Sequence, residues 1–216
     1  MKLTWTIIPV LAGYFLACGP AEQPAPAQPP ALSAADSLQR CAEADALLAR
    51  ADTASREKDS LLLRAAGLYQ ASRAAEAWVK TQRALFNFYR KNDDYDAAFE
   101  QLDAAVRAIW WPEDASTGQL HTLLGFTLRR LGRNYAASIH YEQARQISDR
   151  VGGVTRTNPA GPIYKTLANI KTRLGENEEA IKLLQAGLDL LARDTTAERR
   201  LDNRITQAEI YDDLGI

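Results

Sequence analysis

The feature that most constrains the fold of this chain is a pattern of small and large apolar residues that recurs at intervals of 39, 43 and 40 residues. Its clearest copy comprises Leu124-Gly125, Leu128, Gly132, Ala137, Tyr141 and Ala144. The copy before it comprises Leu85-Phe86, Tyr89, Ala98, Leu102 and Ala105, and the copy after it Leu167-Ala168, Gly175, Ala180, Leu184 and Gly187. A final half copy holds Ala208, Tyr211, Leu214 and Gly215. Small residues at fixed positions allow helices to approach closely, so the pattern predicts a stack of paired helices.

Helical periodicity runs through the chain from Leu32 onwards, and no alternating run is long enough to predict a sheet. Ala, Leu, Arg and Glu, which favour helix, dominate this part, whereas Gly and Pro fall at its breaks. Ser33 followed by Asp36 predicts the cap of the first helix. The pattern predicts an all-α fold of about nine helices, at about residues 34–52, 56–72, 74–91, 95–108, 117–131, 134–150, 161–174, 177–192 and 196–214.

The repeating residues resemble the tetratricopeptide pattern W-x₂-L-G-x₂-Y…A-x₃-F, with His121 where tryptophan is often found. The long period, the loop Val151–Ala160 and the stretch Tyr164–Gly175 are similar to the kinesin-light-chain-like bacterial subtype. This resemblance covers about residues 60–216. It implies an α-solenoid of stacked antiparallel helix hairpins that serves as a protein-binding scaffold. In bacteria this subtype often precedes a caspase-like CHAT peptidase domain or a sensor kinase.

The first residues have the form of a secretory leader rather than of a folded element. Lys2 precedes an apolar run of 14 residues, Thr4–Ala17, which is too short to cross a bilayer comfortably. The run ends in Phe15-Leu16-Ala17-Cys18-Gly19, which resembles a bacterial lipobox. That resemblance implies cleavage before Cys18 and acylation of its thiol and of the new amine. An ordinary secretory signal and an uncleaved anchor are the alternatives.

The segment after the leader predicts a spacer. Gly19–Pro30 has five prolines among twelve residues and no large apolar side chain, so it cannot form a core. We therefore divide the chain into a lipoprotein signal peptide (1–17), a lipidated Cys18 with a Pro/Ala-rich tether (18–33), and a helical repeat domain (34–216). The 26 basic and 27 acidic residues give a net charge of −1, which argues against a general nucleic-acid binder.

The sequence offers no credible catalytic combination. Its two histidines, His121 and His140, fall within predicted repeat helices, where a core or boundary position is the ordinary interpretation. With Cys18 acylated, Cys41 has no intramolecular partner, and a cysteine on an apolar helix face is usually a packing residue. Phosphate-binding loops, metal-spaced His/Cys clusters and serine-elbow motifs do not occur in the sequence. We therefore expect a non-enzymatic protein with no cofactor and no metal.

The first helix of each predicted pair lines the concave face of a solenoid, which is its usual ligand surface. Counting from the small residue of each repeat predicts fifteen positions on that face. They are Lys80, Arg83, Asn87, Arg90 and Lys91; Gln119, Thr122, Phe126, Arg129 and Arg130; and Pro162, Lys165, Asn169, Thr172 and Arg173. Eight of the fifteen are basic and none is acidic, which indicates a groove for an acidic peptide or helix. The alternative is that they are solvated charges paired with acids along each helix.

The sequence therefore predicts a protein–protein interaction scaffold that is lipid-anchored at the bacterial cell envelope, on the outer membrane or the periplasmic face. Its expected partner is another protein or an acidic peptide segment, and not nucleic acid. The predicted last helix, 196–214, has apolar residues and no second helix after it, so self-association through this helix is a further expectation. The alternative is a truncated N-terminal sensor module of a larger signalling protein or CHAT-type peptidase.

Overall fold

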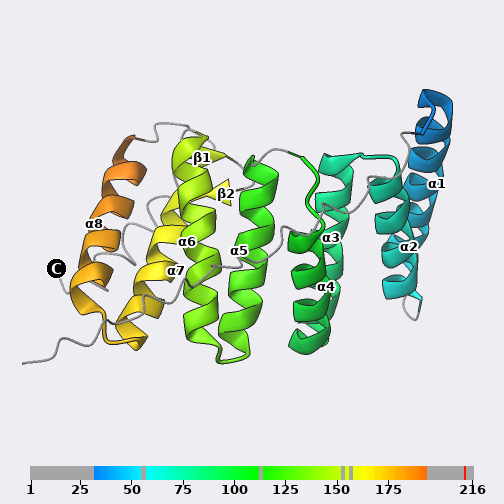
Figure 1. Cartoon of the computed structure of the whole chain (residues 1–216). Coiled ribbons are helices and arrows are strands. Elements are labelled where there is room, and N and C mark those ends of the chain that lie inside the picture. The colour runs from blue at the N-terminus through cyan, green and yellow to red at the C-terminus, as the bar shows by residue number, and fades with distance from the viewer. Residues whose placement is uncertain are drawn as a thin grey trace, which may run out of the picture. The chain divides into compact units, whose positions relative to one another are not determined.

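The structure is a computed structural model, and it describes residues 32–54, 57–111, 114–151, 154–155, 158–193 and Asp212. These residues form eight long helices and one two-residue β-ladder (Figure 1). The helices are α1 (Ala34–Thr53), α2 (Lys58–Ala71), α3 (Ala75–Lys91), α4 (Tyr95–Arg107), α5 (Ala115–Arg130), α6 (Asn134–Arg150), α7 (Ala160–Arg173) and α8 (Asn177–Arg193). All eight agree with the predicted ranges to within two residues. The leader, Cys18, the tether and, apart from Asp212, the predicted ninth helix lie outside the described residues.

Polar side chains fix several of the helix starts. The Ser33 hydroxyl accepts a hydrogen bond from the Asp36 backbone N–H at 3.1 Å, which confirms the predicted cap of α1. Asp94 caps α4 through the Ala97 N–H, and Asp114 caps α5 through the N–H groups of the next turn. Within the described residues, no helix is both long enough and apolar enough to span a membrane.

Four turns between helices share one backbone design. Each has a residue with positive φ: Arg73, Asp93, Gly132 and Gly175. In each turn the next N–H donates to a carbonyl five residues back, at 2.9 to 3.0 Å, as in Ala74 to Tyr69. This arrangement satisfies the last carbonyls of the helix and reverses the chain within a few residues. The repetition of this turn sets successive helices side by side.

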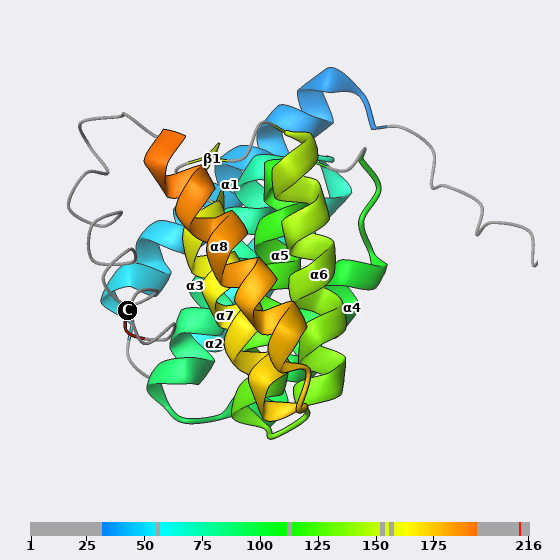
Figure 2. The ribbon, with the colours of Figure 1, turned by 90° about the vertical axis from the view of Figure 1, so that its left-hand side faces the viewer.

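The hairpins α1–α2, α3–α4, α5–α6 and α7–α8 follow one another in chain order (Figures 1 and 2). Each helix packs against the next, and α3 also packs against α5, the first helix of the following hairpin. The loop between α6 and α7 contains the strands β1 (Val154–Thr155) and β2 (Asn158–Pro159), which pair antiparallel. β2 contacts α5. The sequence pattern did not predict this small ladder.

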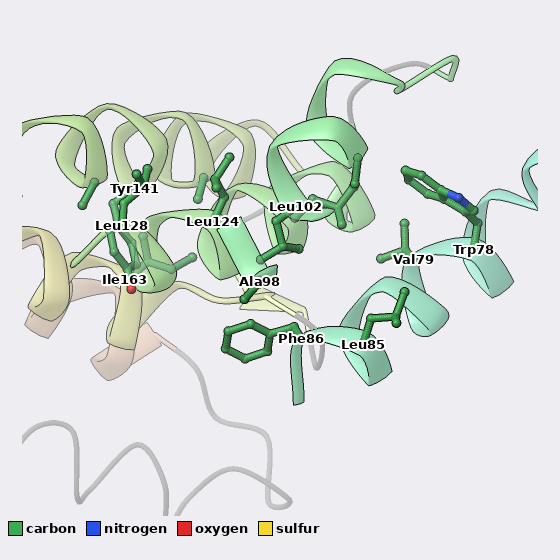
Figure 3. Packing of buried hydrophobic residues seen from close by; sticks show 14 of the residues in the cluster. Trp78, Val79, Leu85, Phe86, Ala98, Leu102, Leu124, Leu128, Tyr141 and Ile163 are labelled. Atoms are coloured by element: carbon green, nitrogen blue, oxygen red, sulfur yellow. The ribbon is translucent and has the colours of Figure 1, made fainter. Parts of the chain in front are cut away.

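The residues of the repeating frame form the core, as the sequence predicts. Its small residues and their large partners are almost fully buried, several of them visible in Figure 3: Leu85, Ala98, Leu102, Ala105, Leu124, Ala137, Tyr141, Ala144, Leu167, Ala168, Ala180 and Leu184. The first hairpin joins this core through one face of α2, which comprises Leu61, Leu62, Ala65 and Tyr69. A continuous core across all four hairpins is what stabilises a stack whose single units are too small to fold alone.

Two clusters join neighbouring hairpins. Trp78 at the start of α3 is buried and packs edge-on against Trp110 and Trp111 in the loop before α5, with ring centroids 5.2 and 5.5 Å apart. Between α6 and α7, the Tyr164 hydroxyl donates to the Asp149 carboxylate at 2.9 Å. Arg145 donates to that same carboxylate and to Glu142. Apolar contact and satisfied polar groups thus both define how one hairpin meets the next.

Candidate binding surface

A hollow of about 690 Å³ lies where α1, α2 and α3 meet. Its apolar lining consists of Leu48, Ala54, Leu62, Ala84 and Phe88. Its polar lining consists of Asp52, Lys58, Lys80, Thr81, Asn87, Lys91 and Asn92. Three of the residues predicted from sequence, Lys80, Asn87 and Lys91, therefore lie on one cavity wall. Ligand sites in proteins commonly combine an apolar lining with a few polar groups in this way.

The hollow has a basic polar rim. Lys58, Lys80 and Lys91 face a single acidic lining residue, Asp52. The Lys80 ammonium lies 2.8 Å from Glu76, but both side chains are largely exposed, so this ion pair is weak and can be exchanged for another carboxylate. The donor groups of Thr81 and Asn92 are bound to backbone carbonyls of α3. The lysines are thus the groups most available to a ligand.

The two other predicted residues of α3 do not line the hollow. Arg83 is exposed. Arg90 is also exposed, and its guanidinium lies 5.9 Å from the ring centroid of Phe86 on its own helix. An arginine above an aromatic face is held by the ring quadrupole and needs no acidic partner.

On α5 the predicted residues form an aromatic and arginine cluster that connects two hairpins. Phe126 is half-buried and packs edge-on against Phe86 of α3, with ring centroids 5.6 Å apart. Arg130 lies over the ring of Tyr95 at 5.0 Å and 3.9 Å from the Asp93 carboxylate. Phe126 is therefore mainly a packing residue between hairpins, and Arg130 is the exposed member of the cluster.

The sequence pattern predicts that Arg129 faces the solvent in a groove, but in the structure its side chain is partly buried. Its guanidinium is 5.4 Å from the ring centroid of Phe126, and its Nε is buried without a hydrogen-bond partner among the described residues. Burial raises the pKa of Tyr141 to about 12, and the neighbouring Arg129 guanidinium acts in the opposite direction. Arg129 is thus partly buried at the α5–α6 contact, beside Tyr141.

The predicted residues of α7 form no common site with the hollow. Lys165 is half-buried, whereas Asn169 and Arg173 are exposed. The α5–α6 hairpin separates α7 from α3 in the stack. The fifteen predicted positions therefore divide into separate groups along the stack.

Sequence reasoning missed the part of the hollow that α1 and α2 contribute, chiefly Leu48, Asp52 and Lys58. The repeat frame begins at α3, so it gave no register for the first hairpin. The available signal was the helical spacing of Leu48 and Asp52, which lie one turn apart at the end of α1.

The sequence also did not reveal that the two histidines meet. His121 of α5 and His140 of α6 are both half-buried, and their Nδ1 atoms lie 3.1 Å apart. In the described part of the chain, no three His, Cys, Asp or Glu side chains are arranged to hold a metal ion. The pair joins α5 to α6 within one repeat.

Comparison with known proteins agrees with these repeats. The tetratricopeptide repeat profile matches residues 116–193, which run from the second residue of α5 to the end of α8. No curated protein matches the chain. The matched repeats are in general interaction modules rather than enzymes, and the comparisons do not favour a sensor or peptidase module.

Several solved structures have a similar arrangement of helices. Two crystal structures of a putative kinesin light chain from Podosopora anserina, with nearly identical TPR-like repeats, align with TM-scores of 0.58 and 0.57 at 20% identity. Each alignment covers 83% of this chain and 88% of the other. BtubC (BKLC) from P. vanneervenii aligns with a TM-score of 0.55 at 21% identity, and the alignment spans 83% of this chain and 64% of BtubC. The chain therefore has the fold of a tetratricopeptide-repeat solenoid, with the repeat's sequence pattern in residues 116–193.

Proposed function

We propose that this protein is a non-enzymatic scaffold that binds an acidic segment of another protein in the hollow between α1, α2 and α3. The observation that carries the proposal is the combination of an apolar lining with three lysines. A segment with an apolar side chain between carboxylates would bury the former against Leu48, Leu62 and Phe88. Its carboxylates would replace Glu76 beside Lys80 and approach Lys58 and Lys91.

Charge complementarity makes this class of ligand the best fit. A cleft lined mainly by one sign of charge concentrates the opposite charge and speeds encounter. The exposed Arg83 and Arg90, on the same helix as two of the lysines, extend the basic surface beyond the hollow. Exposed charges are screened beyond about 8 Å at physiological ionic strength, so binding should weaken as salt rises.

The experiment uses a fluorescently labelled peptide that has one leucine flanked on both sides by glutamates, with a lysine-flanked peptide of equal length as its counterpart. Fluorescence anisotropy compares the wild type with a Lys80→Glu/Lys91→Glu variant. The matched control is Lys182→Glu/Arg193→Glu, which makes the same charge change at exposed positions of α8. We expect salt-sensitive binding of the acidic peptide by the wild type and the control, and at least a tenfold loss in the α3 variant. Equal binding by all three proteins would place the site elsewhere.

We further propose that the protein is held at the bacterial cell envelope by acyl groups on Cys18, with residues 18–33 as the tether. The support is the apolar run that ends at Phe15-Leu16-Ala17-Cys18 and the proline-rich segment that follows it. Each buried CH₂ of an acyl chain contributes about 0.8 kcal/mol, and two or more chains anchor a protein stably. A scaffold held in this way would present its hollow to partners near the membrane.

A further inference from the structure

The contact between His121 and His140 has a geometry that determines how many protons it can hold. The Nδ1 atoms are 3.1 Å apart, the ring centroids are 5.3 Å apart, and the rings are inclined by 26°. The distance between the ring centroids exceeds the distance between the Nδ1 atoms by about the sum of the two ring radii. The two Nδ1 atoms therefore lie on the line between the ring centres and point at each other.

Two ring nitrogens that face each other at hydrogen-bond distance can share one proton but not two. When both rings are neutral, one must carry its hydrogen on Nδ1 and the other on Nε2. A first added proton can go to the unprotonated Nε2 of the donating ring, which strengthens the N–H···N bond by giving its donor a charge. A second added proton must go to the accepting Nδ1, and two N–H groups then oppose each other.

The charged groups that act on His140 from the described residues do little to ease this second step. From α4, the Asp103 carboxylate acts on His140, but it is ion-paired with Arg107. Burial lowers the pKa of His140, and Asp103 opposes this only in part. From α3, the uncharged Phe86 packs against Phe126 of α5.

The other charged side chains of α5 and α6 have contacts with groups outside the pair. Arg129 and Arg130 of α5 lie over Phe126 and Tyr95. On α6, Glu142 and Asp149 are bound by Arg145, and Arg150 lies at the end of the helix. From α7, Tyr164 is bound to Asp149, and Lys171 acts on Glu142.

We propose that His121 and His140 form an acid-sensitive contact in the middle of the repeat stack, which tightens on the uptake of one proton and opens on the uptake of a second. Opening would separate α5 from α6 at the level of the pair, beside α4 of the preceding hairpin. It would therefore alter the junction of two hairpins rather than a surface loop. This inference does not depend on the proposed peptide-binding function.

The direct test is an NMR titration of the wild-type protein. Because the chain has only two histidines, its imidazole signals belong to this pair alone. At about pH 8 we expect nitrogen chemical shifts that show one ring protonated at Nδ1. Both rings protonated only at Nε2 would overturn the proposal. On acidification we expect two steps separated by more than about one pH unit, as for strongly interacting sites. A single step near pH 6.5 for both rings would equally overturn it.

Single variants give a second readout. In His121→Gln and His140→Gln each remaining ring should titrate in one step, because it has lost its proton-sharing partner. Between about pH 7.5 and 4.5, the Tm of the wild type should fall by about 2–4 °C more than that of either variant. An equal fall in all three proteins would show that the pair does not control the acid sensitivity. If a variant fails to fold, the titration of the wild type still decides the question.

Discussion

The ring of Tyr141 lies against Gly125 so closely that a methyl group on that glycine would stand 2.8 Å from the ring's Cδ2 atom. This contact brings α5 and α6 together, and it explains why a glycine and an aromatic residue occupy these two places of the repeating frame.

We predict that Gly125→Ala destabilises the protein, because Tyr141 is buried and cannot move aside without disturbing its neighbours. Overpacking of this kind typically costs about 1–3 kcal/mol. The matched control is Gly67→Ala in α2, where an added methyl group meets nothing within 4 Å. That change should stabilise the helix by about 0.5–1 kcal/mol, since glycine is a poor helix former. Urea denaturation that gives both variants the same stability would contradict the tight α5–α6 contact.

A second prediction concerns the alanines that open the second helices of two hairpins. Ala137 is fully buried and Ala180 is 3% exposed, so a leucine at either position would force α5 from α6 or α7 from α8. Each substitution should lower the unfolding free energy by about 1–3 kcal/mol. Ala104→Leu, at an exposed position of α4, is the control and should change stability by less than about 0.5 kcal/mol. Thermal melts that show no loss for Ala137→Leu or Ala180→Leu would be inconsistent with the repeat frame.

The third prediction is that charge reversal at Arg129 lowers the stability of the protein more than charge reversal at an exposed arginine does. Arg129→Glu would place a carboxylate above the negative face of Phe126, in the partly buried site that now holds a guanidinium beside Tyr141. We expect the unfolding free energy to fall by about 1–3 kcal/mol, as it does when a buried polar group loses its partner. Arg83→Glu, which makes the same charge change at an exposed position of α3, should be nearly neutral. Equal stability of the two variants by urea denaturation would mean that Arg129 has no role in packing.

A fourth prediction concerns acid stability at the α6–α7 junction. Hydrogen bonding from Arg145 is the main cause that lowers the pKa of Glu142 from its ordinary value of 4.5. Because the folded protein holds the charged form more strongly than the unfolded chain does, the contribution of Glu142 is complete above about pH 4.5. It is lost as the pH falls further, through the lowered pKa. Between about pH 5.5 and 3.5 the unfolding free energy should therefore decrease less steeply in Glu142→Gln than in the wild type. If the unfolding free energy depends on pH in the same way in both proteins, Glu142 is not a source of the acid sensitivity.

The fifth prediction is that the mature protein begins at an acylated Cys18. Mass spectrometry of the mature N-terminus should show the mass of the attached acyl chains, since the cysteine follows directly on the apolar run. Cys18→Ala should move the protein from the membrane fraction to the soluble fraction. A free N-terminus at another residue, or unchanged fractionation of the variant, would remove the basis for the proposed anchor.

By itself the sequence determined the helices and their register. The positions of α1 to α8 follow from local periodicity, and the burial of Ala98, Ala137 and Ala180 follows from the repeating frame, because close helix contact requires a small residue at a fixed place. It also indicated that basic residues gather on the first helices of the hairpins.

Only the tertiary structure decided which of these side chains lie together. Lys58 of α2 meets Lys80 and Lys91 of α3 across a junction for which the repeat frame gives no register. Arg129 is partly buried beside Tyr141 of α6, although its place in the repeat frame predicts a groove position. The contact between His121 and His140 joins residues 19 positions apart on two helices. Periodicity fixes the face of a helix on which a residue lies, but the side-chain atoms that meet across an interface depend on the spacing and rotation of both helices and on the rotamers that packing permits.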